Sequence, residues 1–440
     1  MSQQIDKIVE QKINAIQKNE NVYEIGRVIK VNDYVLEVEG LLGVGFFERV
    51  RIGDKAEGYV SAINRNTIGV ALVKVTEEVY VGDIVTPTGE EFTGKFCEKS
   101  VGRIVDMFGK DLMTGQYFDE LIPLQIETKP ISIMDRTSVN RPFATGITGI
   151  DMIYPVGRGQ RQLIIGDKKT GKTQIALDAI VNQKGGDMLC IYVAIGKTKK
   201  EVKEIYTDLL RRGAMDYTII LAAFNDECPP VLRNTPFVGM AIAEFFMLRD
   251  AKDVLVVFDD LKKHADVYRE ISLLTGKVPG RDAYPSDIFF LHASLLERSC
   301  QHKNGGSITA LPIVETKGGD ITEYISSNII SITDGQLVLS QKNFEKGFKP
   351  AIDYGLSVSR LGGAVQTKEM KRIGAAVRRE LLSYLESCDV YELANMDEMS
   401  PELQKKMING KQIRANLNQY KFSPRTMEEM YRLFDGLVEY

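Results

Sequence analysis

The first region with a distinct pattern of hydrophobic and polar positions extends from residue 22 to residue 95. Short runs rich in β-branched residues, such as "EIGRVIK" and "YVLEVEG", follow each other closely, which is typical of strands. The "VND" between these two runs predicts a hairpin, and "NTIGVALVKV" and "GDIVTPTG" add strands with glycine turns. We therefore expect a small β-barrel or sandwich over residues 22–95.

From residue 96 to residue 370, fully apolar runs alternate with helical segments. The runs "RQLIIGD", "MLCIYVAIG", "YTIILAAF" and "DVLVVFDD" are separated by segments such as "KKEVKEIYTDLLRRG". Strands that are apolar throughout have helices on both faces of their sheet. This alternation predicts an α/β domain with a mostly parallel sheet over residues 96–370.

Helical patterns occupy both ends of the chain. In residues 1–21 an apolar stripe is formed by Ile5, Ile8, Val9, Ile13 and Ile16. The stripe fits a helix folded onto its own body and a helix that docks a partner equally well. After residue 371, charged segments such as "KRIGAAVRRELLSYLESC" predict a helical domain that extends to residue 440, with Ser423 and Pro424 expected to start its last helix.

Composition narrows the functional classes. The 440 residues are 44% hydrophobic and 26% charged, as in soluble globular proteins. A net charge of -4 gives no general attraction to nucleic acid, and no run of 18 apolar residues exists, so we expect no membrane span. Five widely spaced cysteines and three histidines show no metal-ligand spacing. We expect reduced thiols, a cytoplasmic location, and no nucleic-acid partner.

The strongest chemical motif is a phosphate-binding loop (P-loop), GxxxxGK[ST], at residues 166–173. It consists of Gly166, Asp167, Lys168, Lys169, Thr170, Gly171, Lys172 and Thr173. An apolar strand precedes it and a helix follows, as the motif requires. Backbone N–H groups at such a helix start bind phosphates. We expect Lys172 to reach the β- and γ-phosphates and Thr173 to ligate Mg²⁺.

A second acidic element completes this site. Asp259 ends the apolar strand "VLVVFD", at the edge where open α/β sheets bind ligands. We favour a role for Asp259 in holding Mg²⁺, directly or through water. The alternative is a carboxylate that caps the next helix, for which Asp260 is the better candidate.

Hydrolysis would require a residue that orients or deprotonates water. Its natural place is the end of the strand beside the P-loop strand, which we expect to be "MLCIYVAIG". Lys197 follows that run, and an ammonium group cannot accept a hydrogen bond from water. Glu201 and Glu227 are other carboxylates in the region, and nothing in their spacing places them in the site.

Arg360 lies in "GLSVSRLGGA", between a strand-like run and two glycines. An arginine on such a turn can project outward as an arginine finger, which stabilises charge on a transferring phosphoryl group and is often supplied in trans. On pattern alone, a surface or ion-paired arginine is the commoner outcome.

Several long motifs resemble the α subunits of F-type rotary ATP synthases: "YPVGRGQRQLIIGDKKTGKTQIALD", "VVFDDLKKHADVYREISLL", "PGRDAYPSDIFFLHASLLERS" and "KPAIDYGLSVSRLGGAVQ". The resemblance implies a β-barrel, a RecA-like nucleotide domain and a C-terminal helical domain. It also implies an alternating hexamer with catalytic β-type subunits around a γ-type shaft, a stalk partner for the N-terminal helix, and peripheral attachment to the cytoplasmic face of the cell membrane through the complex.

The same resemblance assigns roles to individual residues. Lys197 occupies the position of the catalytic glutamate of β subunits, where α subunits usually have glutamine. Arg360 matches the arginine finger that enters the adjoining β-type site. Phe344, Lys349 and Gln419 match residues around the adenine of a bound ATP or ADP, with lysine replacing the usual arginine at position 349.

Two departures point to a divergent relative. The C-terminal domain is shortened, and residues 389–418 align poorly with the family. The absence of tryptophan, with abundant lysine and isoleucine, favours an AT-rich genome such as those of mollicutes, which have F-type-like paralogous motors.

These observations predict a non-catalytic, MgATP-binding α-type subunit of an F-type or F-type-like rotary ATPase. The alternatives are a catalytic homohexameric secretion-type ATPase, which would need a carboxylate at position 197, and a structural hexamer subunit with a vestigial nucleotide pocket.

Overall fold

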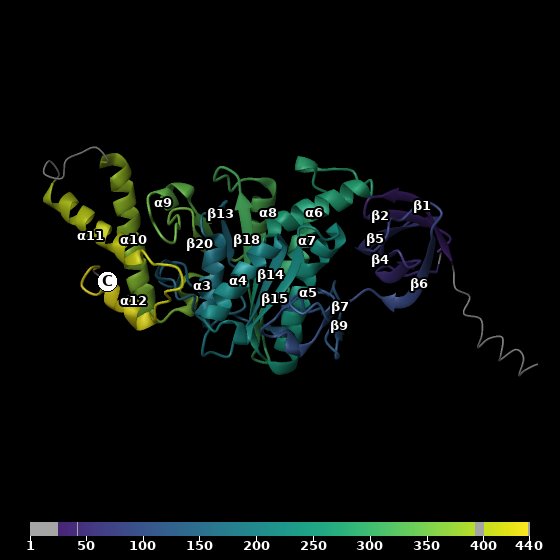
Figure 1. Ribbon diagram of the computed structural model, residues 1–440. Coiled ribbons are helices and arrows are strands. Elements are labelled where there is room, and N and C mark those ends of the chain that lie inside the picture. Colours follow the sequence, from purple (N-terminus) through teal and green to yellow (C-terminus); the bar gives the residue numbers. More distant parts are fainter. Residues whose placement is uncertain (1–24, 42, 392–399, 439–440) are drawn as a thin grey trace, which may run out of the picture. The chain divides into compact units, whose positions relative to one another are not determined.

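The computed structural model describes residues 25–41, 43–391 and 400–438 (Figure 1). These residues form two compact units. One contains the chain up to Phe92 together with Leu274–Gly276, and the other contains the rest. The helix predicted over residues 1–21 lies outside the described residues, so both interpretations of its apolar stripe remain predictions.

The first unit is a closed six-stranded β-barrel, drawn in purple and blue in Figure 1. Its strands are β1 (Gly26–Asn32), β2 (Val35–Glu39), β3 (Glu48–Ile52), β4 (Ala56–Ile63), β5 (Thr67–Val75) and β6 (Ile84–Glu91), joined in the order β1-β2-β5-β4-β3-β6. The predicted hairpin is present: "VN" ends β1, and a turn at Asp33 and Tyr34 joins β1 to β2 in an antiparallel pair. Because the barrel is closed, its sheet has no exposed edge. Its core contains the fully buried side chains of Val28, Leu36, Val50 and Val70.

The second unit is built on a ten-stranded, mostly parallel sheet, which confirms the predicted fold class. The main path runs in the order β20 (Val358–Ser359), β19 (Gly335–Leu339), β13 (Leu163–Asp167), β18 (Ser307–Thr316), β16 (Asp253–Asp259), β14 (Leu189–Lys197), β15 (Thr218–Phe224) and β8 (Ile104–Val105). All seven residues of β15 and of β16 are buried, because helices cover both faces of the sheet.

The strand order corrects one prediction. The P-loop strand β13 lies between β18 and β19, and both β18 and β16 separate it from β14. The expectation that "MLCIYVAIG" lies beside the P-loop strand is therefore wrong. Parallel strands are joined by crossover helices, and a crossover can skip over positions in the sheet that later strands fill. The apolar pattern that predicts each strand contains no information about its neighbours.

Shorter elements and helices complete this unit. Small pairings join β7 (Gly94–Phe96) to β9 (Ile122–Leu124), β11 (Pro142–Phe143) to β12 (Val156–Gly157), and β10 (Arg136–Thr137) to β17 (Gln301–His302). The helices are α2 (Thr148–Asp151), α3 (Lys172–Val181), α4 (Lys199–Arg211), α5 (Pro229–Asp250), α6 (Leu261–Leu274), α7 (Ile288–Leu296), α8 (Tyr324–Ile332), α9 (Gln341–Glu345), α10 (Lys368–Tyr391), α11 (Pro401–Leu417) and α12 (Met427–Phe434). Short 3₁₀ helices occupy Glu98–Ser100, Ile133–Asp135, Met215–Tyr217, Arg281–Ala283 and Gly362–Val365.

Helix α5 is long and apolar enough to cross a membrane by length and composition alone. Its 18-residue apolar window is 83% buried inside the fold. Pro229 and Pro230 occupy its first turn, where a missing N–H removes no helical hydrogen bond. The burial identifies α5 as a core helix that packs against β14, β15 and β16.

The C-terminal helices share one hydrophobic core with the central sheet. Ile373 and Val377 of α10, Ile413 of α11 and Phe434 of α12 are all buried in the cluster that contains the sheet residues. Figure 1 shows these helices, coloured yellow-green to yellow, beside α3 and α9. This packing makes the C-terminal helices part of the nucleotide unit, and the Phe422 N–H donates a hydrogen bond to Asp178 of α3.

The last helix starts later than its sequence pattern predicts. Helix α12 begins at Met427, and Thr426 is its N-cap, in a capping box with Glu429. The expected start at Ser423 and Pro424 is therefore wrong. A threonine three residues before a glutamate satisfies two N–H groups at once, whereas the Ser423 carbonyl accepts a hydrogen bond from the Gln419 side chain.

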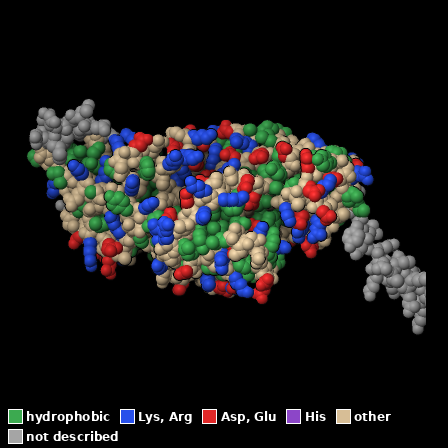
Figure 2. Space-filling model, in the orientation of Figure 1, with side chains coloured by type: hydrophobic (Ala, Val, Ile, Leu, Met, Phe, Trp, Pro, Cys, Tyr) green, Lys and Arg blue, Asp and Glu red, His purple; other side chains and the backbone are tan. Residues whose placement is uncertain are grey.

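The surface mixes charges of both signs. Figure 2 shows lysine and arginine side chains interspersed with aspartate and glutamate over the visible face. This distribution agrees with the small net charge of -4.

Candidate functional site

The P-loop connects the buried strand β13 to helix α3 and has the conformation that its glycines permit. Gly171 has a φ of 98° directly before the helix, a backbone region that L side chains rarely adopt. A Cβ on Gly166 would lie 2.5 Å from the carbonyl oxygen of Leu339, so only glycine fits there. The first N–H groups of α3 therefore point into a concave, anion-binding turn.

Lys172 is held inside this turn. It is 7% exposed, and its Nζ donates a hydrogen bond to the Asp167 carbonyl, 2.6 Å away. Burial lowers the pKa of Lys172, although the carboxylates of Glu315, Asp260 and Asp259 oppose the shift. A phosphate group would restore the charge balance that burial disturbs, so the ammonium group is placed for anion binding.

The other P-loop side chains divide into structural and exposed groups. The Asp167 carboxylate accepts hydrogen bonds from Thr316 Oγ1 at 2.7 Å and from the Gly319 N–H at 2.8 Å, while Thr170 Oγ1 donates to the Asp167 carbonyl. Lys168 and Lys169 are exposed. Asp167 and Thr170 thus fix the loop, and the two lysines face solvent.

At the carboxyl end of β16, the Asp259 carboxylate interacts with three side-chain donors. Its Oδ2 accepts hydrogen bonds from Thr173 Oγ1 at 2.7 Å and from the Tyr192 hydroxyl at 2.5 Å. Its Oδ1 lies 3.0 Å from Lys197 Nζ. Asp259 is 2% exposed, and the pKa of Tyr192 is raised well above its ordinary value by burial and by this carboxylate. The sequence-predicted pair Thr173 and Asp259 is therefore in direct contact.

Lys197 reaches this carboxylate from the next strand of the sheet. Ala194 of β14 pairs with Asp259 of β16, and the register then shifts before Lys197. Burial alone would lower the pKa of Lys197, but the charge and hydrogen bond of Asp259 outweigh it and the net shift is upward. Lys197 is therefore a protonated cation at the phosphate edge of the sheet.

Three other carboxylates near this edge form hydrogen bonds within the protein or are protonated more readily than usual, while Glu315, near the end of β18, lies close enough to Lys172 to act on its pKa. Glu201 accepts hydrogen bonds from the N–H and hydroxyl of Thr198 in a capping box. Asp260 caps α6 by accepting from the Lys263 N–H, as expected. Burial, and then the charge of Asp259, raises the pKa of Asp260 to about 6, and burial raises the pKa of Glu227 to about 7.

Arg360 lies on the surface directly after β20. Its N–H donates to the Asp334 carbonyl, and its guanidinium donates to the Ile330 carbonyl at 3.1 Å. Among the described residues Arg360 forms no ion pair, whereas its neighbour Arg161 pairs with Asp334 at 2.7 Å. The guanidinium of Arg360 thus keeps most of its donors available to another molecule.

The three residues expected around the adenine differ in their exposure and in their hydrogen bonds. Phe344 is 40% exposed on α9. Lys349 is exposed, and its backbone contacts both Asn418 and Gln419. Gln419 is buried, and its amide is fully used: Oε1 accepts from the N–H and hydroxyl of Thr148, and Nε2 donates to the carbonyls of Gly146 and Ser423.

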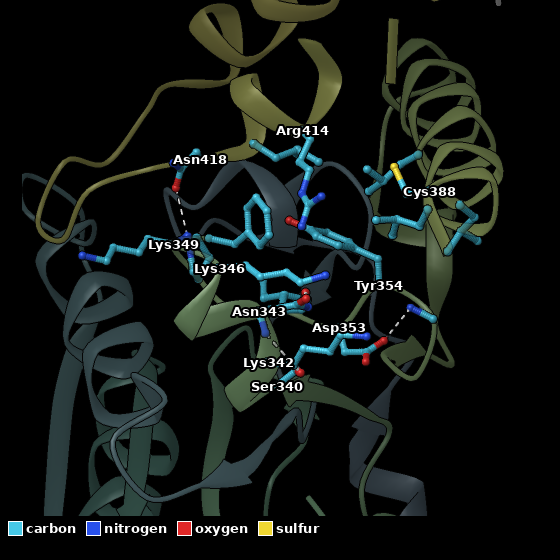
Figure 3. A pocket seen from close by; sticks show the side chains of 18 of the residues that line it. Ser340, Lys342, Asn343, Lys346, Lys349, Asp353, Tyr354, Cys388, Arg414 and Asn418 are labelled. Carbon is cyan, nitrogen blue, oxygen red and sulfur yellow. Dashed lines mark hydrogen bonds between the residues drawn. The ribbon is translucent and has the colours of Figure 1, made fainter. Parts of the chain in front are cut away.

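A cavity of about 350 Å³ lies between the segment after β19 and the C-terminal helices (Figure 3). Lys342, Lys346, Lys349 and Arg414 contribute cationic groups to its lining. The Arg414 guanidinium carbon lies 3.1 Å from the centre of the Phe348 ring. The sequence analysis predicts Lys349 as a site residue but not this cavity, because its walls come from three separate segments, within residues 340–355, 381–388 and 414–418, that meet only in the fold.

The donor set at Thr173 and Asp259 fits Mg²⁺, which prefers hard oxygen ligands and few protein groups. The described residues contain no cluster of three or more His, Cys, Asp or Glu side chains that could hold a metal ion by themselves. The ammonium group of Lys197 at Asp259 Oδ1 is the feature that opposes a divalent cation there.

The contact between Lys197 and Asp259 is absent from the sequence-based expectations. Both residues lie at the carboxyl ends of apolar runs, a signal that places them at one edge of a parallel sheet. The missing information is the strand order, which makes β14 and β16 direct neighbours.

Comparison with known proteins agrees with this geometry. Residues 146–359 match the ATP synthase alpha/beta family, nucleotide-binding domain. The chain is 40% identical to the sodium ion specific ATP synthase subunit alpha of Acetobacterium woodii, covering 97% of this chain and 85% of the relative. It is 40% identical to ATP synthase subunit alpha of Streptococcus agalactiae serotype Ia (100% and 88% covered) and 41% identical to that of Acetivibrio thermocellus (97% and 85%). The chain therefore belongs to the family of nucleotide-binding ATP synthase alpha subunits.

Proposed function

We propose that this chain is a non-catalytic, ATP- or ADP-binding α-type subunit of a rotary ATPase. The observation that supports this proposal most strongly is the ion pair between Lys197 and Asp259, 3.0 Å apart. By the resemblance to the family, Lys197 occupies the position of the catalytic glutamate of β subunits, and an ammonium group cannot accept a proton or a hydrogen bond from water.

In this proposal the P-loop binds the phosphates and leaves them intact. The N–H groups at the start of α3 and the buried ammonium of Lys172 bind the β- and γ-phosphates. Thr173 and Asp259 are the residues that would hold Mg²⁺, which neutralises phosphate charge when bound. The ordered P-loop and the buried Lys172 support an intact nucleotide site over a vestigial one. Phe344 and Lys349 remain our candidates for contact with the adenine, and Gln419, whose amide is fully used within the fold, is our candidate for positioning that side of the site.

The catalytic contribution of the chain is made in trans. The exposed guanidinium of Arg360 has one intramolecular hydrogen bond and no ion pair within the described residues. These features suit an arginine finger that enters the site of an adjacent β-type subunit and stabilises charge on the transferring phosphoryl group.

The assembly we propose is an alternating hexamer with β-type subunits around a γ-type shaft, with a stalk partner at the N-terminal helix. The complex would lie at the cytoplasmic face of the cell membrane, and the chain would take part in ion transport only through this complex. The relative from Acetobacterium woodii is named sodium ion specific, which shows that a relative this similar belongs to a sodium-linked complex.

The proposal is tested with the purified full chain. We expect it to bind a fluorescent ATP analogue and to release no phosphate over many binding lifetimes, and we expect Lys172→Ala to abolish binding. Exposed Lys200 of α4 provides the control, since Lys200→Ala removes the same charge and should leave binding unchanged.

Sustained phosphate release by the chain alone, lost in Lys172→Ala, would overturn the non-catalytic role and favour the homohexameric ATPase. Absence of nucleotide binding in the wild-type chain, alone and in its native complex, would favour the vestigial pocket.

A further inference from the structure

We propose that Lys197 is a built-in cation of the nucleotide site, which makes binding of ATP or ADP by this chain nearly independent of Mg²⁺. The inference rests on the proposed function, because it concerns the same site. It goes further by assigning a specificity-determining role to a residue that would otherwise only mark the loss of hydrolysis.

The first argument is that protein donors already use most of the acceptor sites of the Asp259 carboxylate. This carboxylate accepts hydrogen bonds from Thr173 Oγ1 and from the Tyr192 hydroxyl on Oδ2, and it pairs with Lys197 Nζ on Oδ1. Three of the roughly four acceptor sites of the carboxylate are therefore already used by protein donors. A metal-bound water that hydrogen-bonds to Asp259 would have to use the site that remains on Oδ1, beside the ammonium group of Lys197.

The second argument is charge. A divalent cation at Thr173 gains attraction from the charge of Asp259 only to the extent that no other cation has neutralised it. Lys197 lies within ion-pair distance of that carboxylate, so the attraction that remains for Mg²⁺ is small. The same ammonium repels a metal that approaches Asp259.

The third argument is that Lys197 can interact with the phosphates themselves. It ends strand β14 at the carboxyl edge of the sheet, the edge that also presents the P-loop. Its side chain is 17% exposed, against 3% for Asp259. Together with Lys172, it places a second ammonium group at the edge that presents the phosphate-binding groups, and its partner Asp259 is the more deeply buried member of the ion pair.

A flexible surface lysine would not have this effect. Lys197 gives up little side-chain freedom on nucleotide binding, because the ion pair with Asp259 already fixes its position. Such a preorganised cation contributes its charge to the nucleotide in the way that a bound metal does, without a metal having to be recruited.

The experiment measures the Kd of a fluorescent ATP analogue for the purified full chain, in saturating Mg²⁺ and in excess EDTA. We expect the two values for the wild-type chain to differ by less than about threefold. In Lys197→Gln, removal of Mg²⁺ should weaken binding at least about tenfold, because the site then depends on the metal for its second positive charge.

Two further variants distinguish the effect of the positive charge at position 197 from a general effect of changing the net charge or the structure. Lys197→Arg keeps a cation beside Asp259 and should behave like the wild-type chain in EDTA. Lys200→Gln makes the same change of net charge on the exposed first turn of α4 and should leave the Mg²⁺ dependence unchanged.

The wild-type measurement alone can overturn the inference. A wild-type Kd that rises tenfold or more in EDTA would show that Mg²⁺ is required and that Lys197 does not replace it, while the proposed nucleotide-binding function would stand. Equal Mg²⁺ dependence in wild type and Lys197→Gln would also overturn it. Failure of the wild-type chain to bind nucleotide under either condition would instead overturn the proposed function.

Discussion

The ammonium group of Lys197 and the Oδ1 atom of Asp259 are 3.0 Å apart, in an ion pair whose members expose 17% and 3% of their side chains. The pair joins the ends of two neighbouring strands, β14 and β16. Because Asp259 is buried, its negative charge depends on this partner and on two hydroxyl groups for compensation.

Lys197→Met should destabilise the nucleotide unit, since it leaves the charge of Asp259 buried with hydroxyl donors only. We expect the free energy of unfolding to fall by about 3 kcal/mol, as for other buried pairs broken on one side. Chemical denaturation followed by circular dichroism measures the change. The double variant Lys197→Met with Asp259→Asn should recover part of the loss, and equal stabilities of the single and double variants would contradict this explanation.

Arg360→Ala should leave nucleotide binding by this chain intact and lower ATP turnover of the reconstituted complex by about 10³-fold or more, as expected for a finger supplied in trans. Steady-state phosphate release by the complex measures the effect. Arg211→Ala, an exposed arginine at the end of α4, is the matched control and should not change turnover. Near-normal turnover of the Arg360 variant would end the finger hypothesis.

His264 and His292 should make the protein less stable in mild acid. Both rings are fully buried with centres 5.4 Å apart, and within the described chain neither ring nitrogen of His292 has a hydrogen-bond partner. Burial lowers the pKa of His264 to about 4 and that of His292 well below its ordinary value, with the neighbouring ring adding to the second shift.

The direction of the change in unfolding free energy with pH follows from the number of protons bound by the folded and unfolded chains. Below pH 6.5 the unfolded chain binds protons at both histidines and the folded chain does not, so stability is lost as the pH falls toward 4. His292→Leu should make the dependence shallower by up to about 1.4 kcal/mol per pH unit. Urea midpoints measured between pH 7.5 and pH 4.5 test this, and an unchanged slope would contradict it.

Gln419→Ala should weaken the attachment of the C-terminal helices. Its amide makes four hydrogen bonds, to Thr148, Gly146 and Ser423, and alanine would leave several buried polar groups unpaired. We expect a loss of about 2–4 kcal/mol in unfolding free energy. Gln341→Ala, at an exposed position with one hydrogen bond to Glu345, should change stability far less; comparable losses in both variants would contradict a structural role for Gln419.

The fold class was predictable because its signals are local. Runs such as "VLVVFD" are apolar enough to require burial on both faces, and the P-loop carries its own strand and helix context. The start of α12 was misplaced by three residues, since Ser423-Pro424 and the Thr426 capping box are both plausible helix starts and only backbone geometry separates them.

The sequence indicates which residues lie in the candidate site better than it indicates which of them contact each other. Lys172, Thr173 and Asp259 come together as expected, because motif spacing and strand ends define them. The pairing of Lys197 with Asp259 depends on strand order, which crossover connections set. The inward direction of the Gln419 side chain depends on the turn at residues 146–148, about 270 residues earlier in the chain.

The shared core of α10, α11, α12 and the central sheet has a mechanical consequence. Side chains in a close-packed interior transmit strain rather than absorb it, so a torque applied to the C-terminal helices would be carried into the sheet as a displacement of the whole unit.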